Sequence, residues 1–329
     1  MDILKYAVMR KKYGGNSGGG GGGESGDVSD SDILKGVIEG SIAQISNDTA
    51  TNVNNSLFYE NQNLTEAHFG KAESIGGSTF CRCQNLIRVS APKAKTIGQY
   101  AFQSCYALEE IHFPEVTLIK GRTFEYCIKL TTLDFPKLIT DNGSQTFYGC
   151  SNVVSVNMPN LEYAGASMFQ QCSKITTIDF PKATTIGYQA FNSCSQLTTV
   201  NIPKATSIGN STFTSCTNLK VLDLPSVTSI ASAFQYCSRL KTVILRSETL
   251  CTLTSDSAFN GTPYTGSSYD GKKGGKWVVP RALVEEYKTA TNWSAVLAQQ
   301  ANNKFLALED YTVDGTITGA IDWDKLNAA

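Results

Sequence analysis

At 329 residues, the chain is long enough for two or three ordinary domains, although length does not predict the number of domains in an internally repeated sequence. With a formal net charge of −1, the chain has no excess of positive charge that would attract nucleic acid or an anionic membrane. Ten cysteines are too few for a disulfide scaffold of this length. No apolar run approaches the roughly 18 residues that a membrane-spanning helix needs. We therefore expect neither a nucleic-acid partner nor a transmembrane segment.

The beginning of the chain combines a short apolar stripe with a glycine run. Apolar residues within positions 1–13 recur at spacings of three and four, as on one face of a helix. A helix this short is marginal alone in water, so we predict that it docks onto a carrier structure, the alternative being a frayed terminus. Residues 14–31 are rich in glycine and serine and predict a flexible linker. The basic residues follow the apolar part and no cleavage site is recognisable, so no signal peptide is predicted.

One motif then recurs along most of the chain. A Phe is followed three residues later by a Cys, three residues after that by a Leu, and then by a short apolar strand that usually ends at a Pro. The anchoring residues are Phe58, Phe80, Phe102, Phe124, Phe147, Phe169, Phe191, Phe213 and Phe234, with Phe259 opening a divergent last unit. A period near 22 lies within the range of leucine-rich repeats and predicts a solenoid of about ten repeats over residues 58–259.

Each repeat predicts one strand and one compact turn. Polar Thr199 and Asn201 alternate with Val200 and Ile202, a pattern typical of a strand with one buried face. The segment Ser211–Cys216 predicts a single helical or 3-10 turn that carries its Phe inward. The expected architecture is therefore mainly β, with short helical turns.

Atypical segments flank the repeats. Residues 32–57 continue the spacing without the Phe and Cys and predict an N-terminal cap, as a solenoid needs. Residues 260–329 predict a small α/β cap and tail, with a loop, a last strand at WVVP from Trp277, and two short helices across RALVEEYKTATNW and SAVLAQQ. Residues 309–329 are mixed and acidic, and a strand with a loose end is the only expectation that they support.

The spacing of Phe, Cys, Leu, Val, Ile and Pro over residues 42–260 resembles the BspA-like leucine-rich repeats of bacterial surface and adhesion proteins. The tail from GTPY through WVVPRALVEEYKTATNWS also resembles the cap that follows such arrays. The resemblance implies a curved solenoid that binds host or matrix proteins, or other cell-surface ligands, without catalysis. An apolar start, a glycine run and such repeats are also similar to structural proteins of phages of gut bacteria. A virion protein leaves the cell by lysis, which would explain the missing signal.

The outward strand position supplies the candidate binding face. Short polar side chains occupy this column, at His68, Ser90, His112, Asp134, Asn157, Asp179, Asn201 and Asp223. Just past the strand-closing proline stand Lys93, Lys137, Lys182 and Lys204. Such a ladder could recognise a glycan or a peptide through hydrogen bonds. The alternative is a charged, soluble face that stops open sheets from pairing.

Candidate chemistry is sparse. Eight of the cysteines share one column, where inward thiols behave as small hydrophobes, although disulfides or soft-metal sites are the alternative. At sheet spacing His68 and His112 would lie roughly 9–10 Å apart, too far to share one metal ion. No phosphate-binding loop, dinucleotide fingerprint, nucleophile elbow or zinc-helix motif occurs. We therefore predict no catalytic residue, no cofactor and no metal.

These features favour a non-enzymatic recognition protein. We expect it on a phage virion, as a fibre-type protein of the tail or head that is docked through residues 1–13 and binds a protein or glycan on the host surface. A bacterial cell-surface adhesin is the alternative within the same class. An intracellular protein-interaction scaffold and an enzyme built in the C-terminal cap are alternatives from other classes.

Overall fold

The computed structural model of the protein describes residues 43–266 and 273–329. The predicted docking peptide (1–13), the linker (14–31) and the first part of the N-terminal cap lie outside these described residues. The chain divides into two compact units, Met1–Met158 (unit 1) and Pro159–Ala329 (unit 2). In both units short parallel strands pair with strands one repeat away, which is the arrangement that the 22-residue period predicts.

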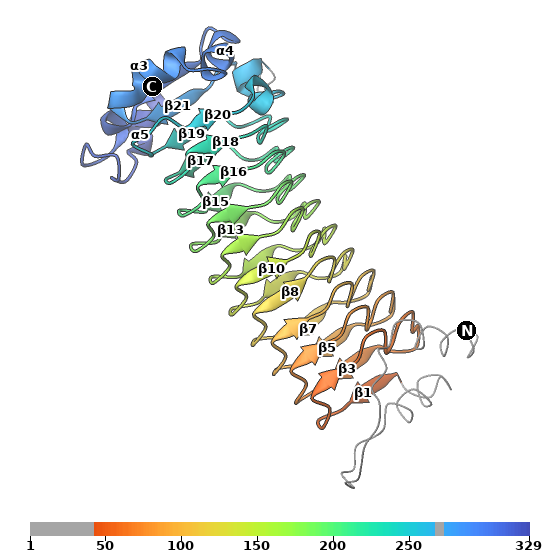
Figure 1. The fold of residues 1–329 in the computed structure, drawn as a ribbon. Helices are drawn as coiled ribbons and strands as arrows, with labels where there is room; N and C mark the ends of the chain where they lie inside the picture. Colours follow the sequence, from red (N-terminus) through yellow and green to blue (C-terminus); the bar gives the residue numbers. More distant parts are fainter. Residues whose placement is uncertain (1–42, 267–272) are drawn as a thin grey trace. The chain divides into compact units, whose positions relative to one another are not determined.

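Unit 1 contains two parallel ladders and a further strand pair (Figure 1). The first ladder consists of β1 (Gln44–Ser46), β3 (Glu66–His68), β5 (Arg88–Ser90) and β7 (Glu110–His112). The second consists of β2 (Asn52–Val53), β4 (Ser74–Ile75), β6 (Thr96–Ile97), β8 (Leu118–Lys120) and β10 (Thr140–Asn142), and β9 (Thr132–Asp134) pairs with β11 (Ser155–Asn157). Ile45 lies opposite Ala67 and Val53 opposite Ile75, so the register expected for the cap is confirmed.

Unit 2 continues the same alternation of strands. One ladder consists of β12 (Tyr163–Ala164), β14 (Thr185–Ile186), β16 (Ser207–Ile208), β18 (Ser229–Ile230) and β20 (Thr252–Leu253), and β13 (Thr177–Asp179) pairs with β15 (Thr199–Asn201). A four-stranded parallel sheet follows, made of β17 (Val221–Leu224), β19 (Thr242–Leu245), β21 (Lys276–Val279) and β22 (Lys304–Ala307). The strand at WVVP is therefore not the last one, because β22 pairs beyond it.

Short helices complete unit 2. They are η1 (Asp256–Phe259), η2 (Pro263–Thr265), η3 (Arg281–Leu283), α3 (Val284–Thr289), α4 (Trp293–Ala298), η4 (Leu308–Tyr311) and α5 (Trp323–Ala328). The two predicted cap helices are confirmed as α3 and α4. The strand expected within residues 309–329 is wrong, since α5 ends the chain and buries Leu326 against Ile244, Val278 and Leu308. No helix within the described residues is long and apolar enough to cross a bilayer.

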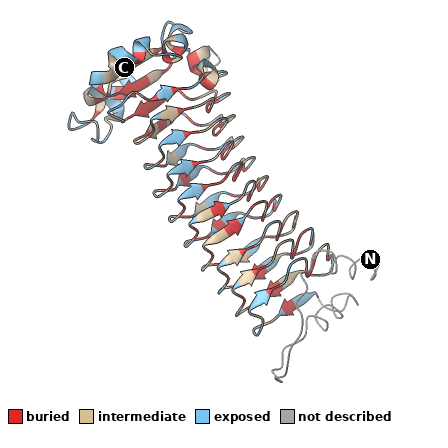
Figure 2. Cartoon of the chain, in the orientation of Figure 1, coloured by how far each residue is buried: buried red, intermediate tan, exposed pale blue. Residues whose placement is uncertain are grey.

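The anchoring phenylalanines form the interior of both units. They are fully buried, and neighbouring rings stack. Figure 2 shows that buried residues recur along the strands of each unit. In unit 1 the ring centroids of Phe80 and Phe102 are 5.1 Å apart, and in unit 2 those of Phe191 and Phe213 are 5.5 Å apart. Stacked rings at this spacing add to the burial of their apolar area. The repeat therefore fixes the core in the same way in both units.

The cysteine column lies beside the phenylalanines. The Cys105 thiol donates to the backbone carbonyl of Phe80 at 3.0 Å, and the Cys194 thiol to that of Phe169 at 3.2 Å. In the first repeat, Asn61 replaces the cysteine, and its side chain accepts instead from nearby backbone N–H groups. All ten cysteines are buried and none forms a disulfide, so the interpretation of the column as core is confirmed and the disulfide alternative is not.

The turn that carries Phe213 bonds to the following repeat. Ser211 and Ser215, which flank Phe213, adopt left-handed φ angles of 56° and 62°. The N–H groups of Phe213 and Ser215 donate to the carbonyls of Ala233 and Gln235 in the following repeat, at 3.0 and 2.8 Å. A helical turn would direct these N–H groups along its own axis. The segment does have bonds between residues three apart, from the Thr214 N–H to the Ser211 carbonyl and from the Cys216 N–H to the Phe213 carbonyl. The predicted short turn that buries its Phe is therefore present, and it also adds a third row of bonds between neighbouring repeats.

Candidate binding surface on the strand face

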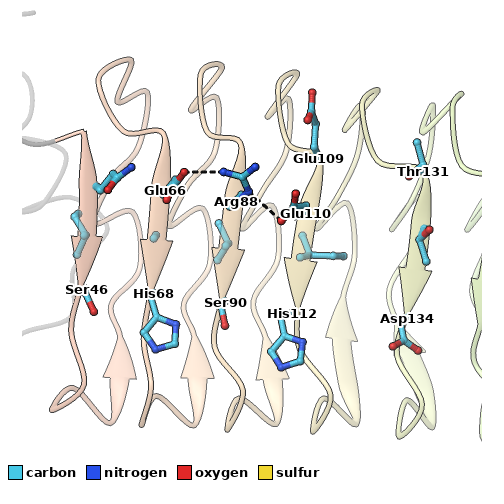
Figure 3. A pocket seen from close by; sticks show the side chains of 16 residues that line it. Ser46, Glu66, His68, Arg88, Ser90, Glu109, Glu110, His112, Thr131 and Asp134 are labelled. Carbon is cyan, nitrogen blue, oxygen red and sulfur yellow. Dashed lines mark hydrogen bonds and ion pairs between the residues drawn. The ribbon is translucent and has the colours of Figure 1, made fainter.

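The predicted polar column is a straight row on the first ladder of unit 1. Alternation along a strand directs the third residue of β3, β5 and β7 outward. These residues are His68, Ser90 and His112, and the parallel register places each opposite the next. Figure 3 shows their side chains on one face of the strands. The His68 Nε2 atom lies 3.3 Å from Oδ1 of Asp48, which anchors the beginning of the row.

A second row on the same face was not predicted. It consists of the first residue of each strand, Glu66, Arg88 and Glu110 (Figure 3). Arg88 lies 2.9 Å from a carboxylate oxygen of each glutamate. The bond to Glu110, and then the bond to Glu66, raises the pKa of the Arg88 guanidinium. These residues stand two positions before the predicted column, so the same alternation could have revealed them.

The two rows line a groove of about 840 Å³ on the strand face of unit 1. Its lining also includes Glu109, Thr131 and Asp134. Four carboxylates and one guanidinium stand among the lining residues, so with neutral histidines the formal charge of the lining is −3. No Phe, Tyr or Trp side chain is among the described residues of the lining. The groove therefore presents charges and hydrogen-bonding groups that Arg88 partly orders.

The remaining polar residues of the column are bonded to one another. The Asn157 amide donates to Oδ1 of Asp134 at 2.7 Å in unit 1, and the Asn201 amide donates to Oδ1 of Asp179 at 2.7 Å in unit 2. Asp223 accepts from Arg246, whose Nη2 lies 2.7 Å from its Oδ2. Because Arg246 is mostly buried, this pair has a structural role, and Asp223 is the predicted site residue that is least available to a ligand.

The predicted lysines lie beyond the ends of the strands and outside the lining of the groove. Lys137 lies 2.6 Å from Oε2 of Glu115, and this bond lowers the pKa of the Glu115 carboxyl. Lys182 donates to an asparagine side chain of the preceding repeat at 2.6 Å. Lys93 and Lys204 are exposed on the turns that follow their strands. The two predicted lysines of unit 1, Lys93 and Lys137, therefore do not belong to the described lining of its groove.

The cysteine column offers no reactive group. Burial raises the pKa of the Cys150 thiol to about 12 and that of Cys237 to about 12. Protonated, buried thiols are neither nucleophiles nor good metal ligands. In the part of the chain that the structure describes, no group of three or more His, Cys, Asp or Glu side chains could hold a metal ion.

Parallel strands that recur every 22 residues over an interior of stacked Phe and buried Cys define a leucine-rich repeat solenoid. The chain belongs to the BspA-type leucine-rich repeat family, whose model matches six copies over residues 39–94, 73–185 and 165–269. These ranges cover more than half of the chain. Among proteins of curated function, none matches the sequence.

Solved structures show the same fold. A leucine-rich repeat protein from Bacteroides ovatus is 20% identical, with a TM-score of 0.61, over 80% of this chain and 68% of that chain. A leucine-rich cell surface protein from Faecalibacterium prausnitzii is 19% identical, with a TM-score of 0.46, over 86% of this chain and 88% of that chain. At this identity, the likeness to the Bacteroides ovatus protein supports the fold alone.

Proposed function

We propose that this protein is a non-enzymatic recognition module that binds a protein partner in the groove of unit 1. The groove itself carries this proposal, because it gathers charged side chains on the one face that the repeat leaves variable. Its charge of −3 favours a partner that presents Lys or Arg side chains to Glu66, Glu109 and Glu110.

The ordering of these side chains supports binding over mere solubility. Arg88 holds Glu66 and Glu110 at 2.9 Å each, so part of the conformational entropy of the two carboxylates is lost before any partner arrives. A purely solubilising face gains nothing from such fixed geometry. A glycan is the second kind of ligand that the polar lining could hold, but the described lining has no Phe, Tyr or Trp side chain of the kind that commonly lines ligand pockets.

Photo-crosslinking would test the site. Benzoylphenylalanine in place of Ser90 would stand in the groove, and the same group in place of Thr199 would stand on the exposed strand face of unit 2 as a matched control. We expect the variant at position 90 to crosslink one protein on the envelope of the target cell, and the variant at position 199 to crosslink none. Crosslinking from position 199 alone, or from neither, would refute the proposal.

For the location, we propose display on a phage virion, with residues 1–13 docked onto the particle and residues 14–31 as the tether. The apolar stripe followed by a glycine run supports this proposal. Deleting residues 1–26 should abolish assembly onto the particle and leave the thermal melting curve of the repeats unchanged. Mass spectrometry that finds the protein on the bacterial envelope, and not in purified particles, would favour the cell-surface adhesin instead.

A further inference from the structure

The last sheet of unit 2 brings several lysines to one edge. Lys276 begins β21 and Lys304 begins β22, and the parallel register places them directly opposite each other. Lys241 immediately precedes β19, where its carbonyl accepts from the N–H of Lys276 at 2.8 Å. Together with Lys273, these residues line a pocket of about 500 Å³, called the lysine pocket here.

Like charges directly opposite each other on neighbouring strands are destabilising. The lysine pocket contains such a pair at Lys276 and Lys304, and none of the described residues of its lining has a carboxylate side chain. Burial, and then the charge of Lys304, lowers the pKa of the Lys276 ammonium. The pair is therefore a concentration of positive charge that the lining itself does not neutralise.

The end of α5 offsets part of this charge. Lys276 Nζ donates to the carbonyl of Leu326 at 2.8 Å, and Lys304 Nζ donates to a main-chain oxygen of Ala329. Carbonyls at the end of a helix attract cations. Each ammonium has three N–H donors, and one such bond is recorded for each within the described residues. Helix capping therefore explains why the two lysines are tolerated, and it leaves donors for a ligand.

The pocket is built on ordered elements. The N–H of Gly275 donates to Oδ1 of Asn303 at 2.9 Å, and the Asn303 amide donates to the carbonyls of Tyr264 and Val296 at 2.9 and 2.8 Å. These bonds hold the residues just before β21 against the residues just before β22. The ammonium groups therefore project from strand positions whose register is set, which favours a defined site over a diffuse basic surface.

We propose that the lysine pocket binds an oxyanion group, a phosphate or sulfate carried by a small ligand or free in solution. Several ammonium groups around one cavity suit the charge and the multiple acceptor oxygens of such a group. The volume lies within the range of small-molecule sites. This site is separate from the groove of unit 1 and does not depend on the function proposed for it.

Isothermal titration calorimetry at low ionic strength would test the proposal, with inorganic phosphate, inorganic sulfate, glucose 6-phosphate and a heparin hexasaccharide as probes. We expect at least one probe to bind with a stoichiometry of one, and its affinity to fall as salt is added. The double variant Lys276→Gln/Lys304→Gln should weaken the binding at least tenfold. Lys288→Gln/Lys325→Gln removes the same charge from helices outside the lining and should leave the affinity unchanged.

The choice of probe separates the sources of the anion. Binding of phosphate and glucose 6-phosphate alone would indicate a phosphorylated ligand, and binding of sulfate and the hexasaccharide alone would indicate a sulfated glycan. Chemical-shift changes of the Gly274 and Gly275 amides in the wild-type protein would locate the site even if a variant fails to fold. No binding by any probe, or equal loss in both double variants, would overturn the proposal.

Discussion

The strand faces of the two units differ, while both interiors are built on stacked phenylalanines. In unit 1 the first residues of β3, β5 and β7 are charged, whereas the equivalent residues of β13 and β15 in unit 2 are Thr177 and Thr199. Beneath its strand face, each unit contains a stack of phenylalanines of the same kind. The comparison teaches that the repeat conserves what must be buried and leaves the face free to vary. Recognition is therefore to be sought in those variable positions.

The largest expected effect on stability tests whether the interiors of unit 1 and unit 2 are equivalent. Replacing Phe102 in unit 1 or Phe191 in unit 2 by Ala should reduce the free energy of unfolding by about 3–5 kcal/mol in each case. Both rings are fully buried and stacked on both sides. Urea denaturation followed by circular dichroism would measure the loss. A loss below about 1 kcal/mol at either position would mean that its ring is not part of the core.

One position breaks the equality of the interiors. Asp141 on β10 lies opposite Ile119 of β8, in a column where unit 2 has residues such as Ile186. Its Oδ1 accepts from the Thr146 hydroxyl at 2.6 Å, and its Oδ2 has no partner among the described residues. Burial raises the pKa of this carboxyl to about 6, against the opposing effect of the Thr146 bond.

This shift predicts a pH-dependent stability. The folded state holds the Asp141 proton more tightly than the unfolded state does, so its contribution is complete below about pH 4 and is lost as the pH rises through 6. Through this group the wild-type protein should lose about 3 kcal/mol of its free energy of unfolding between pH 4 and pH 8, and the Asp141→Asn variant should not show this loss. Unfolding at a series of pH values would contradict this account if Asp141→Asn kept the wild-type slope.

Two arginines, one in each unit, allow the strand faces of the two units to be compared. Arg246 is mostly buried and bonds to Asp223 and to the carbonyls of Ile317 and Gly319, so Arg246→Met should cost about 2–3 kcal/mol of stability. Arg88 bonds to two glutamates on an exposed face, so Arg88→Met should leave the thermal midpoint unchanged. Thermal melting of both variants would test this contrast. Equal destabilisation would mean that the groove of unit 1 is structural.

The sequence predicted the structure best at the buried positions that recur in every repeat. The Phe, Cys and strand positions follow from the period, because each must fill the same interior space in every turn. The left-handed φ angles at Ser211 and Ser215 in the turn around Phe213 could not be predicted, because serine gives no signal as clear as glycine would. The pair of Lys276 and Lys304 was invisible, since residues 28 positions apart meet only through the pairing of β21 with β22.

The central claim is that the groove of unit 1 is the recognition surface, and one binding measurement tests it most directly. The protein crosslinked from position 90 would be titrated with the wild-type chain, with Glu109→Gln/Glu110→Gln, and with Glu285→Gln/Glu286→Gln, which removes the same charge from α3. We predict that the groove variant binds at least tenfold more weakly, while the helix variant binds like the wild type. Equal affinities for all three proteins would contradict the account.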